Sequence, residues 1–206
     1  MPCSTPTLAL LVTMLALRLA QVFAPFDLAA YLDLAPRAVW HGELWRLFTA
    51  ALLTRGLTDL VFDALALYWL AGALENHWKP REWPLYGALC VGVGSLLACA
   101  LFPGVPVISV GPAGLIGALL VARVRLAPAE RIQLSTTFSL PVIALLLLWA
   151  GCVALAAFGG GFPLSSVLAV LATAATGWLY LSLRWRFLNR RPAQSVTSGR
   201  FDRLEM

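Results

Sequence analysis

The stretch IQLSTTFSLPVIALLLLWAGCVALAAFGGGFPLSSVLAVLATAATGWLYLSL, residues 132–183, decides the class of fold, because it runs for 52 residues without a charged side chain. A second uncharged stretch covers residues 83–122. One helical crossing of a bilayer needs about 20 apolar residues, so each stretch is long enough for two crossings. The sequence therefore predicts several membrane-spanning helices.

The composition of the whole chain supports this class. Hydrophobic residues make up 60% of the 206 residues and charged residues 12%, with a mean hydropathy of +0.82. Soluble domains average roughly 45–50% and about 25%. These values exclude a soluble enzyme, a nucleic-acid-binding protein and a disordered chain, and the basic pI of about 9.4 is better explained by membrane topology.

Clusters of glycine and proline divide the two uncharged stretches, because residues 103–106 (PGVP) and 159–163 (GGGFP) end helices. The expected fold is an all-α polytopic membrane protein, a bundle of six transmembrane helices within a domain of residues 1–185, followed by a basic cytoplasmic tail at 186–206. The expected spans are 6–24, 60–74, 84–102, 111–122, 137–158 and 165–183.

Basic residues set the orientation. If the N-terminus is cytoplasmic, most of the 15 Lys and Arg residues lie on the cytoplasmic side, so both termini are expected there. No basic residue precedes Arg18, which favours a retained first helix over a cleaved signal peptide. A single lysine among many arginines suggests a GC-rich bacterial genome, and hence a bacterial cytoplasmic membrane.

The connection between the first two spans, residues 25–58, is long and too apolar for a solvated linker. Residues 44–53 are expected to form a short amphipathic helix in the membrane interface. Trp45 would anchor it at headgroup depth, and Arg46 would extend its charge towards water.

The first-loop stretch HGELWRLFT, residues 41–49, resembles the first loop of the rhomboid family, which carries a Trp-Arg motif. The resemblance continues through 63–75 on the second span, GPAG at 111–114, where the family has G-x-S-G, and 173–180 on the sixth span. It covers about residues 6–185, and the size of the core is similar to that of the rhombosortase branch.

Rhomboids are intramembrane serine endopeptidases, and the resemblance implies that this chain has lost their catalytic residues. The nucleophilic serine corresponds to Ala113 and the histidine base to Val170. The asparagine that supports the oxyanion corresponds to Asp63, and two further histidines to Asp59 and Thr54. An alanine methyl group can neither attack a peptide bond nor be activated by a base.

Two functions in different classes follow, and a third is weaker. The resemblance to inactive rhomboids and derlins implies a pseudoprotease that holds transmembrane helices of client proteins in the bilayer. The alternative is an active intramembrane endopeptidase whose catalytic residues align differently, and the third is a small ion- or proton-coupled transporter. No cofactor, metal or nucleic acid is expected in any of them.

Arg55, Asp59 and Asp63 are spaced four residues apart and lie on one face of the second span. Charged residues inside a membrane often mark a functional polar site. The simpler alternative is an Arg55–Asp59 ion pair at the outer end, with Asp63 paired to Arg46 or protonated.

Small residues recur in the fourth and sixth spans, where they allow close packing of helix backbones. Gly111, Gly114 and Gly117 are spaced by three, and Thr173 and Gly177 by four. We expect these residues to have a structural role.

The orientation is testable with reporter fusions. Fusions after Lys79, Arg131 and Met206 should report a cytoplasmic location, and a fusion after Arg37 an external one, because basic residues are retained on the cytoplasmic side. A cytoplasmic signal at Arg37 would contradict the span count.

Overall fold

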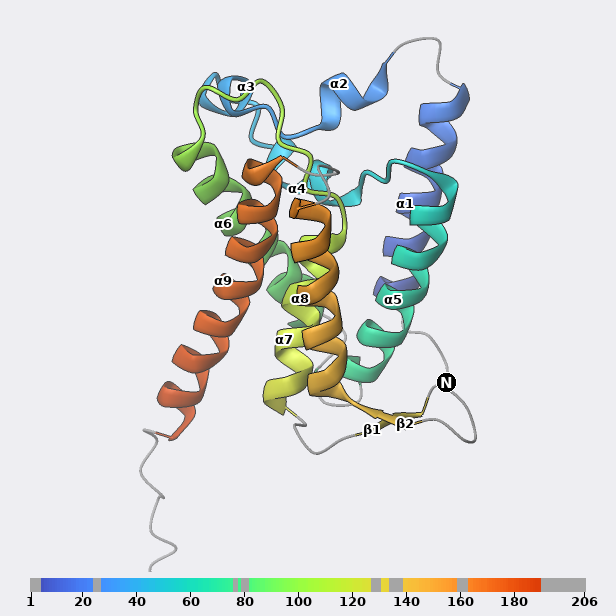
Figure 1. Cartoon of the computed structure of the whole chain (residues 1–206), viewed down its shortest axis with the longest axis vertical. Helices are drawn as coiled ribbons and strands as arrows, with labels where there is room; N and C mark the ends of the chain where they lie inside the picture. Colours follow the sequence, from blue (N-terminus) through green and yellow to red (C-terminus); the bar gives the residue numbers. More distant parts are fainter. Residues whose placement is uncertain are drawn as a thin grey trace, which may run out of the picture.

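The computed structural model describes residues 5–23, 27–75, 78, 82–126, 131–133, 139–158 and 163–189. Within these ranges the chain is a bundle of helices that run roughly along one direction (Figure 1). Six of the described helices have 14 or more residues: α1 (Thr5–Phe23), α5 (Leu57–Glu75), α6 (Glu82–Leu101), α7 (Ala113–Leu126), α8 (Val142–Phe158) and α9 (Leu164–Asn189).

The connection between α1 and α5 contains the remaining helical segments, which lie at one end of the bundle (Figure 1). The single amphipathic helix expected at 44–53 is instead a short α-helix followed by a 3-10 turn. The segments are α2 (Leu28–Leu32), α3 (Pro36–Trp40), α4 (Arg46–Thr49) and η1 (Ala50–Leu52).

The all-α expectation needs one correction, between α7 and α8. Strands β1 (Arg131–Gln133) and β2 (Ser139–Pro141) pair antiparallel, so within the described part of the predicted span 137–158 the chain is a strand up to Pro141 and becomes helical only at Val142. Pro141 explains the position of the boundary, because proline is tolerated before a helix but not within one. The predicted tail at 186–206 begins inside α9, and residues 190–206 lie outside the described residues.

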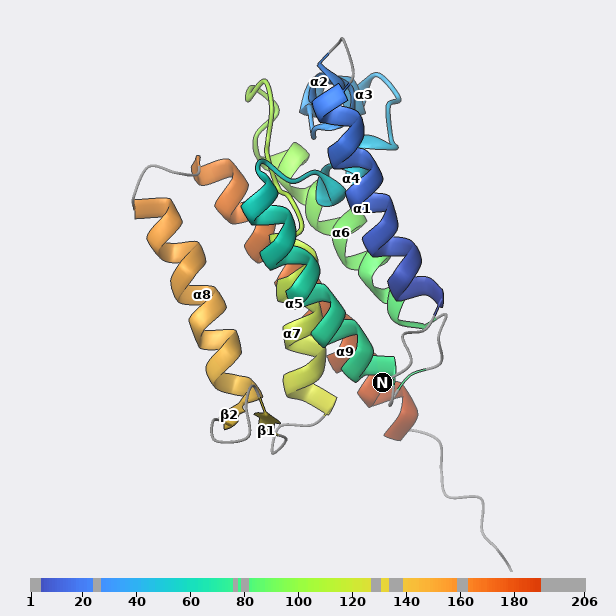
Figure 2. The same cartoon turned by 90° about the vertical axis from the view of Figure 1, so that its right-hand side faces the viewer.

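Helix α7 occupies the centre of the bundle, in contact with α5, α6, α8 and α9 (Figure 2). Every residue from Gly114 to Arg123 is buried. The helix runs four residues beyond the predicted span 111–122 and includes Arg123 and Arg125, since basic side chains stabilise the C-terminal end of a helix.

The closest approach in the bundle joins α6, α7 and α9 at Thr173. A Cβ atom placed on Gly94 of α6 would lie 2.7 Å from Thr173 Cα, and one on Gly114 of α7 would lie 3.4 Å from Thr173 Cβ. The Thr173 hydroxyl donates to the carbonyl oxygen of Ala169 (2.9 Å), so its polarity is satisfied within α9. Because Gly94 and Gly114 have no side chains, Thr173 of α9 can pack directly against the backbones of α6 and α7.

A second contact of this kind lies one turn further along α9. Gly177 faces the Tyr86 hydroxyl of α6, which donates to the carbonyl oxygen of Ala118 of α7 (2.9 Å). Gly117 faces the ring of Trp149 on α8. Gly117 of α7 therefore allows α8 to pack closely on α7, and Gly177 of α9 allows Tyr86 of α6 to pack closely on α9.

The other helices pack at the periphery. Helix α1 packs on α5, and the Thr7 hydroxyl donates to the Glu75 carboxylate. Helix α8 lies at the edge of the bundle and has one buried residue, Val142, while Leu147, Leu155 and Phe158 are exposed (Figure 2). Such an exposed apolar helix belongs in lipid.

Three of the described helices are long and apolar enough to cross a membrane: Thr5–Phe23, Glu82–Leu101 and Leu164–Arg184. Helix α8 is strongly apolar but has only 17 residues. The protein is therefore a helical membrane protein.

The contact at Thr173 predicts a large difference between two glycine substitutions. Gly94→Ala should destabilise the protein by about 1–3 kcal/mol, because its Cβ overlaps the backbone of α9. Gly72→Ala in α5 meets nothing within 4 Å and should be neutral or stabilising by up to about 1 kcal/mol. Thermal unfolding in detergent followed by circular dichroism measures both, and equal midpoints would contradict the packing described.

Candidate functional site

A cavity of about 210 Å³ lies between α5, α7, α8 and α9. Its lining contains Asp63 of α5, Ala113 of α7 and Val170 of α9. These residues come from three helices and are up to 107 positions apart in the sequence. The structure therefore brings together the three positions that the rhomboid resemblance assigns to nucleophile, base and oxyanion support.

The turn before α7 places Ala113. Gly111 has a φ of 59°, a left-handed conformation that favours glycine, and a Cβ atom at this position would lie 3.4 Å from the carbonyl oxygen of Leu53 in the first loop. Pro112 follows, and α7 begins at Ala113. Gly111 thus has a role in the turn, whereas the expected role was helix packing.

Thr173 places Val170 on the other side of the cavity. Val170 precedes it by three residues, so both side chains face α7, with Val170 nearer the start of α9. Thr173 contacts Gly114, the residue after Ala113, so the tight helix contact involves residues close in sequence to the cavity lining on both helices.

The rest of the lining is mainly apolar, with two further polar groups. Cys152 of α8 is exposed, and Ser166 of α9 is fully buried. Within the described residues the Ser166 hydroxyl has no hydrogen-bond partner. Because buried hydroxyls are normally paired, Ser166 offers an unpaired hydroxyl to a molecule in the cavity, and Asp63 adds a carboxylate to the same lining.

The lining does not supply a serine–histidine pair. None of the described residues that line the cavity is a histidine. His41 ends α3 in the first loop and is exposed, and His77 lies outside the described residues. A serine nucleophile needs a base within hydrogen-bond reach, and among the described lining residues only the Asp63 carboxylate could accept its proton.

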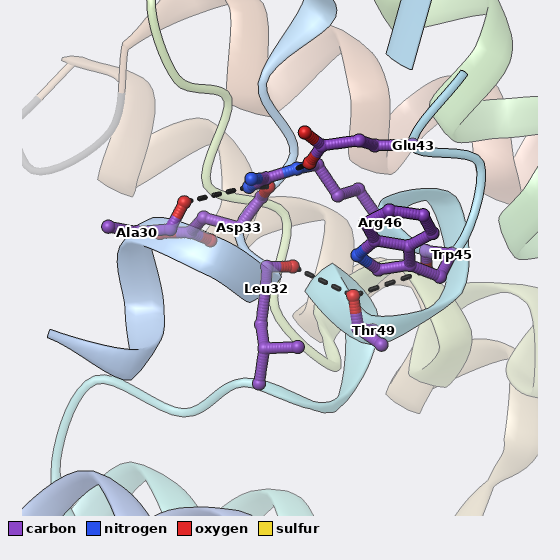
Figure 3. A network of polar contacts seen from close by, with 7 residues as sticks. All are labelled: Ala30, Leu32, Asp33, Glu43, Trp45, Arg46 and Thr49. Atoms are coloured by element: carbon purple, nitrogen blue, oxygen red, sulfur yellow. Dashed lines mark hydrogen bonds and ion pairs between the residues drawn. The ribbon is translucent and has the colours of Figure 1, made fainter. Parts of the chain in front are cut away.

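Arg46 of the Trp-Arg motif organises the first loop (Figure 3). Its guanidinium pairs with Glu43 (2.5 Å) and donates to the carbonyl oxygens of Ala30 (2.8 Å) and Asp33 (3.0 Å). Arg46 is 6% exposed, so the expectation that it extends into water is wrong, as is its pairing with Asp63. Trp45 beside it is about half exposed, as an interfacial anchor would be.

The same loop is attached to the rest of the bundle. The Thr49 hydroxyl donates to the carbonyl oxygen of Leu32 (2.8 Å; Figure 3), and the Ser95 hydroxyl of α6 donates to that of Leu47 (3.1 Å). The Ile108 amide of the α6–α7 connection donates to the carbonyl oxygen of Leu34 (2.7 Å). The first loop is therefore fixed to α6 and to the turn that positions Ala113.

The remaining predicted polar residues lie elsewhere. Asp59 is exposed in the first turn of α5, where a carboxylate is favourable. Thr54 and Arg55 line a second, polar cavity near the end of α1, together with Asp33. The polar face expected along the second span is thus divided between two sites.

Comparison with known proteins agrees with the helical membrane class. Residues 7–205 match the family described as "eukaryotic integral membrane protein (DUF1751)". The chain belongs to this family, and membrane localisation follows from it. No curated protein matches the chain in a sequence search.

Sequence reasoning missed Gly94, Trp149 and Ser166. Gly94 and Ala98 form a small-xxx-small pair on the third predicted span, so a signal of the kind used for the fourth and sixth spans was present there. Ser166 belongs to none of the motifs identified in the sequence. Its burial and its place in the cavity depend on the tertiary packing of α9.

Proposed function

We propose that this protein is a rhomboid-like intramembrane pseudoprotease that binds transmembrane helices of client proteins. The observation that carries the proposal is the convergence of Asp63, Ala113 and Val170 on one cavity. In a rhomboid these positions hold the oxyanion support, the nucleophile and the base. Here they leave a space bounded by one carboxylate and two apolar side chains.

The proposal includes six membrane crossings with both termini in the cytoplasm. Helix α7 has 14 residues, a length of about 21 Å, which is below the roughly 30 Å of a hydrocarbon core. Its burial by α5, α6, α8 and α9 favours a crossing in which neighbours shield its ends. The orientation and the bacterial origin stay predictions from the sequence.

The proposed entrance lies between α5 and α8. Both helices line the cavity, and both pack against α7. Helix α8 has one buried residue, Val142, the fewest of the long helices described, so its displacement would expose few buried side chains beyond the contact of Trp149 with Gly117. A client helix would reach Asp63 sideways from the lipid.

Clients with a polar residue in their transmembrane helix fit this cavity best. A charged side chain at the bilayer centre costs about 2.5–3.5 kcal/mol on insertion scales. Asp63 and the unpaired hydroxyl of Ser166 would offset part of this cost by hydrogen bonding. A uniformly apolar helix would gain nothing from them.

A probe that reacts with nucleophilic serines distinguishes the proposed pseudoprotease from the alternative, an active endopeptidase. We expect the purified protein not to react with a fluorophosphonate, and not to cleave a rhomboid test substrate above a heat-killed control. Ala113→Ser alone should not restore activity, because Val170 cannot act as a base. Labelling of the unmodified protein would favour the endopeptidase.

Photocrosslinking tests client binding directly. Benzoylphenylalanine in place of Phe62, an exposed aromatic residue beside Asp63, or of Cys152 should capture a client helix that carries one central asparagine. The same group at Val12, an exposed residue of α1 that does not line the cavity, is the matched control.

Substitutions of Asp63 distinguish specific binding of the client helix from chance encounters in the membrane. Asp63→Leu should reduce capture at least about threefold, the loss expected for one hydrogen bond. Asp63→Asn, which keeps polarity, and Asp59→Leu, outside the cavity, should retain capture. Equal capture of a polyleucine helix by all variants would overturn the proposal.

A further inference from the structure

The second cavity has about 320 Å³ and is built by four separate segments. The last turns of α1 and residues 27–33 form one side, and residues 53–55 and Ser109 form the other. It lies at the end of the bundle where α1 stops and α5 begins (Figure 1). Its volume is at the lower end of the range for small-molecule sites.

Its lining carries both signs of charge. Arg18 and Arg55 contribute guanidinium groups, and Asp27 and Asp33 contribute carboxylates. Arg18 lines this cavity although it lies within the predicted first span. A lining of this kind suits a ligand with a positive and a negative group close together.

Two polar atoms of the lining residues are buried without a hydrogen-bond partner in the part of the chain that the structure describes. They are Arg18 Nε and the hydroxyl oxygen of Thr54, a residue that is only 5% exposed. Arg18 uses another nitrogen, Nη1, to bond Gln21 (3.1 Å). Both atoms can donate a hydrogen bond, so they suit an anionic acceptor.

Asp33 contributes a carboxylate whose burial the nearby arginines do not fully compensate. Burial raises the pKa of its carboxyl group above the ordinary value, Arg55 acts in the opposite sense, Asp27 raises it further, and Arg46 lowers it. Burial therefore outweighs the nearby arginines. A cation bound beside Asp33 would stabilise its ionised form.

Exposed apolar side chains flank the cavity towards the bilayer. On α1, Leu19 and Val22 alternate with the lining residues Arg18 and Gln21, and on α5 Leu57 and Val61 follow Arg55. The polar cavity thus adjoins two lipid-facing helix surfaces. Acyl chains could lie along them while a headgroup occupied the cavity.

We propose that this cavity binds a phosphoethanolamine group, supplied by a membrane phospholipid. The phosphate oxygens would accept from Arg18 Nε and the Thr54 hydroxyl, and the primary ammonium would donate to Asp33. A quaternary ammonium has no hydrogen to donate, and a glycerol headgroup has no positive charge. Phosphatidylethanolamine therefore binds more tightly than phosphatidylcholine or phosphatidylglycerol.

The test uses the purified full-length protein in detergent with short-chain lipids. Dihexanoyl phosphatidylethanolamine should raise the unfolding temperature, and form adducts in native mass spectrometry, at lower concentration than the choline or glycerol lipid. Glycerophosphoethanolamine, which has the headgroup without chains, should bind more weakly. If it binds as tightly as the lipid, the cavity recognises the phosphoethanolamine group, but the proposal that a membrane phospholipid supplies this group is overturned.

Thr54→Val gives the sharpest variant, because it removes an unpaired hydroxyl at constant shape. Without lipid its stability should equal or exceed that of the unmodified protein. Its affinity for dihexanoyl phosphatidylethanolamine should fall at least about tenfold, the lower end of the range for one hydrogen bond to a charged group. Thr58→Val, on the exposed first turn of α5, should change neither.

Asp33→Asn tests the ammonium contact separately. It should abolish the preference for the ethanolamine over the choline lipid while leaving binding of either detectable. Equal affinity of the unmodified protein for all three lipids, or an unchanged affinity in Thr54→Val, would overturn the proposal. Neither outcome bears on client binding at Asp63.

Discussion

The contact of Thr173 with the glycines of α6 and α7 is the constraint on which the rest of the structure depends. It brings three helix backbones to within a side chain of one another, an approach that only Gly94 and Gly114 permit. In lipid, where apolar surface gains little from burial against protein, such close packing supplies much of the association energy. The cavity that contains Asp63 lies next to this contact, because its lining residues Ala113 and Val170 come one and three residues before Gly114 and Thr173.

The first loop depends on a different interaction, the burial of Arg46. Its guanidinium holds the backbone carbonyls of Ala30, within α2, and Asp33, at the end of α2, and Glu43 neutralises its charge. A buried charge without such partners would be strongly destabilising. Because Ser95 ties the same loop to α6, it is a fixed part of the bundle, and on the proposed function a client helix would enter past α8 instead.

The helices were largely predictable from the sequence, since apolar length and glycine–proline breaks determine them locally. The described helices begin within three residues of five predicted spans, but α9 continues six residues beyond its predicted end, and the fifth span differs because β2 precedes α8. The grouping of Asp63, Ala113 and Val170 was anticipated only through resemblance, because nothing in their spacing links three helices. The burial of Arg46, the partner of Gly94 and the position of Ser166 were not predictable, as each depends on contacts between distant segments.

The position of α9 in the core also bears on how the chain assembles. Ribosomes deliver α9 after the other described helices, yet it supplies Thr173 and Gly177 to the contacts with α6 and α7. The central contacts therefore cannot close until synthesis of the membrane domain is complete, and the earlier helices wait in the bilayer without their packing partner. Helix α8, delivered just before, must leave a path for α9 to reach α6. Its sparse packing is consistent with an element that joins a core completed after its own insertion.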